Sequence, residues 1–181
     1  MARGNIPGAL NDVEIYIGGS NRLAGIGEVE LPNVEYSTVT AEQIGMTSEY
    51  EVPLLGHFKK LEAKIKMDCI DHTLLNFNNN DAILVECKGA LQSINRITHA
   101  AITEGIDATF KGLIKKFDGP KLKPGSKLDS SFDLSVSYYK LEIGGKVIIE
   151  IDVLNNINNI NGSNNDLIRK LMHYWDNKQK L

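Results

Sequence analysis

Acidic and imidazole side chains gather at one place in the sequence, where Asp68, Asp71 and His72 lie within five positions. Carboxylate and imidazole groups can bind a metal ion, but such a site needs further ligands at defined spacing. The other histidines, His57, His99 and His173, do not lie at the spacing that further ligands would need. We therefore expect no metal and no other cofactor.

An asparagine-rich run, Asn155–Asp166, has a superficial likeness to a calcium-binding loop. If Gly162 is placed at the invariant glycine, Ile157 and Ile168 fall at the first and last ligand positions. Neither side chain can supply the carboxylate that a calcium loop requires there. We expect these asparagines to act in turns, where their side chains hydrogen-bond the backbone.

The motifs of nucleotide binding and of nucleophilic catalysis are incomplete. Gly18-Gly19 lacks the Lys-Ser/Thr of a phosphate loop, and Gly25-Ile26-Gly27 lacks both a third glycine and a following helix. No Gly-x-Ser-x-Gly elbow is present. Since no nucleophile is placed beside a base, we predict that the chain is not an enzyme. Cys69 and Cys87 form no CxxC pair, which favours two buried thiols in a cytosolic protein, with a disulfide as the alternative.

Charge is spread unevenly along the 181 residues, whose formal net charge is −3. The segment from Leu23 to Phe58 carries acidic residues and no Lys or Arg, whereas lysines dominate from Ala108 to Lys127. The lysines are Lys111, Lys115, Lys116, Lys121, Lys123 and Lys127. The two segments are either solvated loops or complementary surfaces of neighbouring subunits. Only Phe117 lies among the lysines, so stacking on single-stranded nucleic acid is poorly supported.

Alternating apolar residues predict a protein made mainly of strands. Lys60–Met67 alternates cleanly, and Val147–Val153 repeats the pattern with Ile148 as its one interruption. Phe132–Ile143 changes phase at Tyr138-Tyr139, which indicates a bulge or a strand buried on both faces, and Gly144-Gly145 predicts a tight hairpin. The other expected strands are Val13–Ile17, Gly25–Leu31, Ile83–Cys87 and His99–Phe110.

Helices and long loops are expected at a few places. Asp71–Asn78 and Asp166–Trp175 are the two candidate short helices. Two long irregular stretches are predicted at Ser37–Leu55 and Asp118–Ser131, because their apolar residues follow neither the period of a strand nor that of a helix. Such stretches in compact domains are usually functional or disordered. With no repeat or linker, residues 1–181 are predicted to form a single domain.

The C-terminal part carries a recognisable order of motifs: Tyr139–Lys146, then Glu150-Ile151-Asp152, Asn155 and Asn161-Gly162. This order resembles the end of the major tail tube proteins of contractile-tailed phages and R-type bacteriocins. The N-terminal half is similar too, in a strand and glycine turn (Ile15–Gly19), a strand ending Leu31-Pro32, a loop with Gly45-Met46, and the strand Lys60–Met67. The resemblance spans nearly the whole chain.

The resemblance implies an antiparallel β-sandwich or barrel protomer that closes into hexameric rings. Stacked rings would form the inner tube of a contractile tail, which conducts DNA in a phage and dissipates ion gradients in a bacteriocin. Its partners would be other copies of itself, the tail sheath, the tape measure and the baseplate. DNA would pass without specific binding, and the monomer would have no stable membrane association. Assembly would take place in the host bacterial cytoplasm, and the product would be part of a virion or bacteriocin tail.

Two other functions are weighed against the tail tube. A hexameric ring protein of type VI secretion would favour small discs over long tubes. A ligand-binding β-barrel enzyme or a lectin-like module would need a convergent polar pocket, for which the sequence offers no candidate residues.

Three groups of residues are expected to form the interfaces and the bore of such a tube. The inter-ring loop is Gln43, Ile44, Gly45, Met46, Thr47, Ser48 and Glu49. A basic interface loop consists of Lys115, Lys116, Lys121, Lys123 and Lys127. The lumen candidates are Glu28, Glu30, Glu150 and Asp152, although Glu150 and Asp152 could instead bind lysines across an interface.

Overall fold

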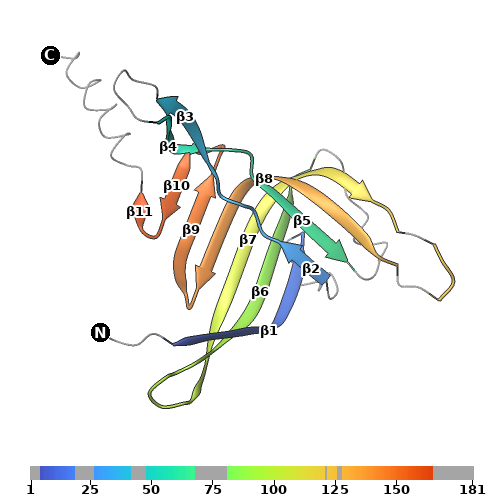
Figure 1. The fold of residues 1–181 in the computed structure, drawn as a ribbon. Coiled ribbons are helices and arrows are strands. Elements are labelled where there is room, and N and C mark those ends of the chain that lie inside the picture. Colours follow the sequence, from blue (N-terminus) through green and yellow to red (C-terminus); the bar gives the residue numbers. More distant parts are fainter. Residues whose placement is uncertain are drawn as a thin grey trace.

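The computed structural model describes residues 5–18, 27–41, 48–67, 81–120, 122–125 and 128–164, and every regular element within these ranges is a strand (Figure 1). The strands are β1 (Ile6–Ile17), β2 (Gly27–Glu30), β3 (Tyr36–Ala41), β4 (Tyr50–Phe58), β5 (Glu62–Met67), β6 (Ile83–Ile94), β7 (Ala101–Asp118), β8 (Ser130–Ile143), β9 (Lys146–Asp152), β10 (Ile157–Ile160) and β11 (Ser163–Asn164). All pairings are antiparallel, which confirms the mainly β prediction.

The two predicted helices, Asp71–Asn78 and Asp166–Trp175, lie outside the described residues. Within the described part of the chain, no helix is long and apolar enough to cross a membrane.

One sheet of nine strands contains most of the chain, in the order β1-β6-β7-β8-β9-β10-β11, with β5 also paired to β8 and β2 paired to β5. Strand β8 has β7 along one edge and shares its other edge between two strands. Its first half, Ser130–Ser135, pairs with β5, and its second half, Tyr138–Ile143, pairs with β9. The sheet therefore forks at the middle of β8, as Figure 1 shows.

A bulge at Ser137 produces this fork and changes the phase of β8. Val136 lies opposite Gly112 on β7 while Tyr138 lies opposite Lys111, so Ser137 is the extra residue. The register shift falls one residue before the predicted position and confirms the bulge. An extra residue moves the following side chains to the other face, so the buried positions change from even to odd numbers along β8.

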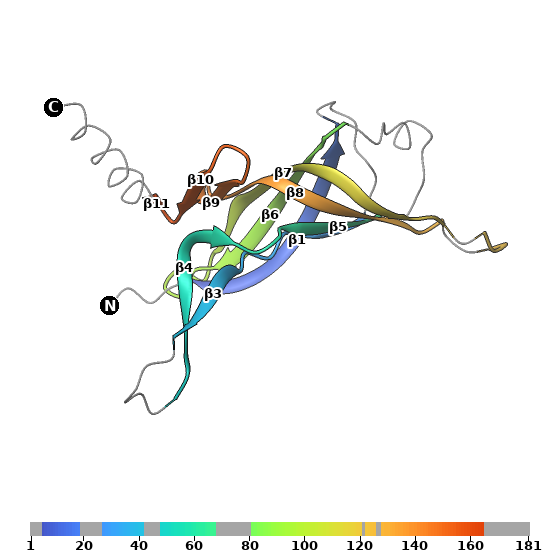
Figure 2. The ribbon, with the colours of Figure 1, turned by 90° about the horizontal axis from the view of Figure 1, so that it is seen from above.

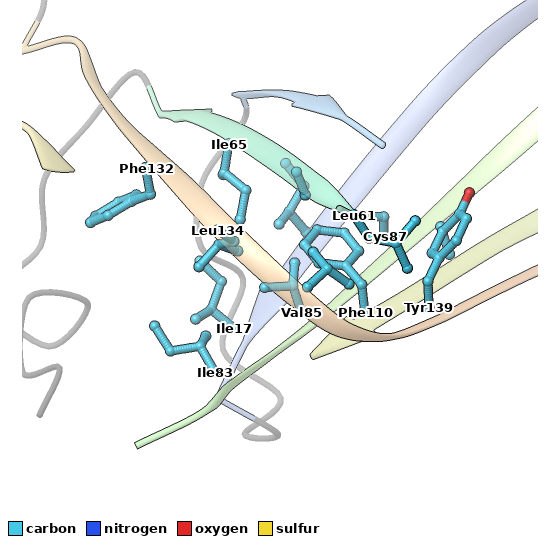
Figure 3. Close-up of a cluster of buried hydrophobic side chains, with 14 of the residues drawn as sticks. Ile17, Leu61, Ile65, Ile83, Val85, Cys87, Phe110, Phe132, Leu134 and Tyr139 are labelled. Atoms are coloured by element: carbon cyan, nitrogen blue, oxygen red, sulfur yellow. The ribbon is translucent and has the colours of Figure 1, made fainter. Parts of the chain in front are cut away.

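The core lies between β2 and β5 on one side and the sheet β1-β6-β7-β8 on the other (Figure 3). The buried side chains are Ile15, Ile17, Leu61, Ala63, Ile65, Met67, Ile83, Val85, Cys87, Ala108, Phe110, Phe132, Leu134, Val136, Tyr139 and Ile151. The alternation predicted for Lys60–Met67 is confirmed, because Leu61, Ala63, Ile65 and Met67 are all buried. Burial raises the pKa of the Cys87 thiol to about 12, so this cysteine is an inert core residue.

The prediction that Val147–Val153 turns one face into the core holds for part of the strand. Ile151 is fully buried and Ile149 packs against the core. Val153, in contrast, is 57% exposed, because β9 ends at Asp152 and Val153 begins a turn. Gly144-Gly145 forms the predicted hairpin with positive φ at both residues.

Ser37–Leu55 is not the irregular stretch that was expected. Most of it forms the two-stranded sheet of β3 and β4, which extends away from the main sheet (Figure 2). The second predicted irregular stretch is shorter than expected, since β7 continues to Asp118 and β8 begins at Ser130. The described residues between these two strands, 119–120, 122–125 and 128–129, carry no strand.

Candidate functional site

The side of the main sheet that faces away from the core carries most of the charged side chains of its strands, and we call it the charged face. Directly paired residues of neighbouring strands project to the same side of a sheet. Glu62, Lys64 and Lys66 alternate with buried residues on β5, so they point away from the core. Their partners on β2 are Glu30 opposite Lys64 and Glu28 opposite Lys66. These two lumen candidates therefore lie on the charged face.

The same face continues past the fork to the other two lumen candidates. Tyr138 pairs with Lys111 on one side and with Asp152 on the other, and Lys140 pairs with Glu150. Tyr139, which lies between Tyr138 and Lys140 on β8, points into the core. Tyr138, Lys140 and the residues paired with them therefore point outward. Glu28 and Glu30 on β2, and Glu150 and Asp152 on β9, therefore all point away from the core, although β2 and β5 cover the core from the side opposite β1, β6 and β7.

Acidic side chains outnumber lysines on the described strands of this face. The twelve acids are Asp12, Glu14, Glu28, Glu30, Glu62, Glu86, Asp107, Asp118, Asp133, Glu142, Glu150 and Asp152. The seven lysines are Lys64, Lys66, Lys88, Lys111, Lys115, Lys116 and Lys140. The face is therefore acidic on balance, but lysines lie among its acids.

Ion pairs link many of these charges within the chain. Lys66 Nζ lies 2.9 Å from Glu28 Oε2 and 3.0 Å from Glu30 Oε1. Glu62 binds two lysines, with Lys115 Nζ at 2.5 Å and Lys60 Nζ at 3.1 Å. These hydrogen bonds from lysine hold the pKa of Glu30 and of Glu62 below its ordinary value of 4.5, so both carboxyls are ionised at neutral pH. The side chains are substantially exposed, so the pairs contribute little to stability and act mainly on the surface potential.

Asp152 has a second role within its own turn. Its Oδ1 accepts hydrogen bonds from the backbone N–H groups of Leu154 and Asn155, and its Oδ2 accepts one from the Asn155 side chain. Asn155 Nδ2 is the main cause of the lowered pKa of Asp152. The asparagines do serve turns, as Asn156 and Asn161 have positive φ, but it is Asp152 that satisfies the backbone at this turn.

The β3–β4 hairpin carries an exposed apolar surface, which we call the hairpin face. Val39 pairs with Val52, and Tyr50 and Leu54 lie two residues before and after Val52, on the same side of the hairpin by alternation. These four side chains are between 38% and 57% exposed. At the base of the hairpin, Tyr36 and Phe58 pack with ring centroids 4.9 Å apart. The sequence did not predict this face, although Tyr50, Val52 and Leu54 alternate as in a strand. The positions between and after them, Pro53 and Leu55, are apolar too, so no alternation of polar and apolar residues is visible.

The expected inter-ring loop is described only in part. Ser48 and Glu49 lead into β4 and are exposed, whereas Gln43–Thr47 lie outside the described residues.

Comparison with known proteins identifies the family of the chain. The phage tail tube protein FII family matches residues 7–170. The chain belongs to this family. It is 26% identical over 160 residues to the "Major tail tube protein" of Serratia phage KSP20, a match that covers 88% of this chain and 91% of that protein. In the cryo-EM structure of an extracellular contractile injection system, the PVC sheath/tube terminator in the extended state, one chain is similar with a TM-score of 0.48 and 9% identity, over 75% of this chain and 96% of that one.

As a member of the phage tail tube protein FII family, the chain is structural and not an enzyme. Among its described residues, no three or more of His, Cys, Asp and Glu are grouped so that they could hold a metal ion.

The basic interface loop of this tail tube protein differs from the expectation. Lys115 and Lys116 do not lie in a loop but near the end of β7, where they pair with Glu62 and with Asp118 of the same chain. The run of lysines was predicted to lie in a loop, but it continues β7. A bulge between Ile114 and Lys116 then places the side chains of both Lys115 and Lys116 on the charged face. Lys123 is exposed and lies between β7 and β8, and Lys121 and Lys127 lie outside the described residues.

Proposed function

We propose that this tail tube protein forms hexameric rings that stack into the inner tube of a contractile tail, with the charged face lining the bore. The observation that carries the proposal is that all four lumen candidates point away from the core, on the acid-rich charged face. Such a bore conducts DNA in a phage or ions in a bacteriocin. Residues 1–181 act as one tube domain.

An acid-rich face suits a bore because DNA must move through it without being held. Lysines repeated around every ring would bind phosphates and release counterions, which makes binding tight. The excess of acids over lysines instead repels the duplex. Glu28, Glu30, Glu150 and Asp152 supply part of this repulsion.

Free sheet edges supply the means for ring closure. Among the described strands, β1 pairs only with β6 and β2 pairs only with β5. Exposed edges invite pairing with another chain, and a closed ring removes them. Head-to-tail contacts that close as a ring can also stack along its axis.

The hairpin face and the residues between β3 and β4 make the contact between rings. A two-stranded hairpin alone is marginally stable, and an apolar side chain gains most when a partner covers it. Deletion of Gln43–Glu49 leaves a folded protomer that no longer stacks. Long tubes from this deletion variant would disprove the assignment.

Acidic and basic segments of neighbouring subunits also meet, with Lys121, Lys123 and Lys127 as the basic side. Charge reversal at Lys121 and Lys123 slows assembly, more strongly at low salt, because salt screens such contacts. Assembly at the wild-type rate at every salt concentration would count against this contact.

In the assembled tail, the sheath surrounds the tube, and the tape measure and baseplate complete it. The subunit is made in the host cytoplasm and ends in the virion or bacteriocin particle. Electron microscopy of the purified protein tests the proposal. Long tubes support it, isolated discs indicate a secretion-type ring, and monomers at high concentration contradict it.

A further inference from the structure

One region of the charged face, together with Lys60 just before β5, contains as many lysines as acids, and we call it the paired patch. It lies over β2, β5, the first half of β8 and the end of β7. Its acids are Glu28, Glu30, Glu62, Asp118 and Asp133, and its lysines are Lys60, Lys64, Lys66, Lys115 and Lys116. Five lysines this close would form a strong phosphate-binding surface if their charges were available.

Each lysine of the paired patch lies beside a carboxylate of the same chain. Glu28 and Glu30 share Lys66, and Glu62 bridges Lys60 and Lys115 at 3.1 and 2.5 Å. Lys116 Nζ lies 2.9 Å from Asp118 Oδ1. Lys64 pairs in register with Glu30 on one side and with Asp133 on the other.

A hollow of about 320 Å³ lies at the centre of the patch, lined by Glu30, Glu62, Lys64, Lys115 and Asp133 among others. A phosphate group approaching this hollow meets lysines and carboxylates together. It gains little from the lysines, because the carboxylates already compensate their charge and would themselves repel it.

We propose that Glu28, Glu30 and Glu62 mask a latent binding site for polyanion backbones that Lys60, Lys66 and Lys115 form with their neighbours. With the three glutamates present, the patch lets a duplex pass. Without them it grips phosphates, since among the described acids of the patch the five lysines then face only Asp118 and Asp133. The biological meaning of this mask rests on the proposed function as a DNA conduit, but the mask itself is a property of the folded chain.

The test compares duplex binding by the wild type and by the variant Glu28→Gln/Glu30→Gln/Glu62→Gln. Glutamine keeps the size and shape of each side chain and removes its charge. Binding of a short labelled DNA duplex is followed by fluorescence anisotropy over a salt series. Release of three lysines should steepen the slope of log affinity against log salt by about 2 to 3, at roughly 0.9 per phosphate neutralised.

A matched control changes the same number of charges away from the strands of this face. Glu35→Gln/Glu49→Gln/Glu51→Gln also raises the net charge by three, and it releases Lys59, whose Nζ lies 2.5 Å from Glu35 Oε1. Equal duplex binding by the two triple variants would show that only net charge matters and would overturn the proposal. The same holds if the wild type already binds as tightly as the patch variant.

A second control adds Lys66→Gln and Lys115→Gln to the patch variant and should abolish the gained binding. Persistent binding would place the site elsewhere and refute the mask. Electron microscopy of the same samples keeps the two proposals apart. If the wild type forms normal tubes but the patch variant gains no duplex binding, only the mask is overturned. If the patch variant gains duplex binding but the wild type forms no tubes, only the conduit is overturned.

Discussion

The Ser137 hydroxyl donates a hydrogen bond to the backbone carbonyl oxygen of Lys111 at 3.2 Å, at the position where β8 changes its neighbour. Just before it, the Val136 N–H donates to the Leu61 carbonyl, and the Ser137 carbonyl accepts from the Val153 N–H, both at 2.9 Å. The bulge therefore satisfies the backbone while two strands share one edge of β8. It also lets the charged face continue from β5 to β9.

Close approach of β7 and β8 at this bulge should make Gly112 intolerant of substitution. A Cβ atom at Gly112 would lie 2.2 Å from the Ser135 carbonyl oxygen, which is backbone and cannot move aside cheaply. Gly112→Ala should cost at least about 1–3 kcal/mol of unfolding free energy, as overpacking does. Gly105→Ala is the control on the same strand, because a Cβ there meets nothing within 4 Å. Equal melting temperatures of the two variants would contradict this account of the bulge.

Burial differs sharply between two apolar residues at the end of β9. Ile151 is 1% exposed and Val153 is 57% exposed. Ile151→Ala should cost about 2–5 kcal/mol, through lost burial and the cavity left behind. Val153→Ala should be nearly neutral in the same denaturant titration. If Ile151→Ala leaves stability unchanged, Ile151 does not belong to the core.

Assembly should depend on the hairpin face while folding does not. The variant Val39→Thr/Val52→Thr/Leu54→Thr keeps residues suited to strands but removes apolar surface. We expect a melting temperature near that of the wild type and a loss of tubes in electron micrographs. Thr38→Ser/Thr40→Ser changes the opposite side of β3 and should assemble normally. Normal tubes from the triple variant would show that no subunit covers this face.

Acid should remove the stabilising effect of the Asp152 carboxylate. The pKa of Asp152 in the folded chain lies below its ordinary value of 3.8, mainly because of the hydrogen bond from the Asn155 side chain. Its contribution is therefore present above pH 3.8 and is lost as pH falls through the lowered folded pKa. The melting temperature of the wild type should exceed that of Asp152→Asn at neutral pH, and the gap should close in acid. If the difference in melting temperature between the two proteins stays constant with pH, the charge of Asp152 does not contribute to stability.

Local patterns in the sequence predicted those parts of the fold that local chemistry determines. Alternation identified the strand Lys60–Met67, the paired glycines identified the hairpin at Gly144-Gly145, and the phase change identified the bulge within one residue. The hairpin β3–β4 was missed because its polar side contains Pro53 and Leu55. The apolar residues of the hairpin face resemble no core strand, since they stay 38% to 57% exposed among the residues that the structure describes.

The candidate site was harder to predict because it depends on pairings between distant strands. Glu62 and Lys115 are 53 residues apart and meet only because β5 and β7 flank β8. Alternation predicted that Glu28 and Glu150 would share a charged surface with their strand neighbours, but it could not show that lysines join the same surface. The lysine run around Lys115 was therefore assigned to an interface loop instead of the face.

Cryo-electron microscopy of the assembled tube tests the central claim most directly, because it reveals the side chains around the bore. We expect stacked hexameric rings in which the charged face points to the axis and presents Glu28, Glu30, Glu150 and Asp152, with the lysines of the paired patch held by their glutamates. A bore lined mainly by Lys64, Lys111, Lys115 and Lys116 with unpaired side chains, or by the hairpin face, would contradict the account.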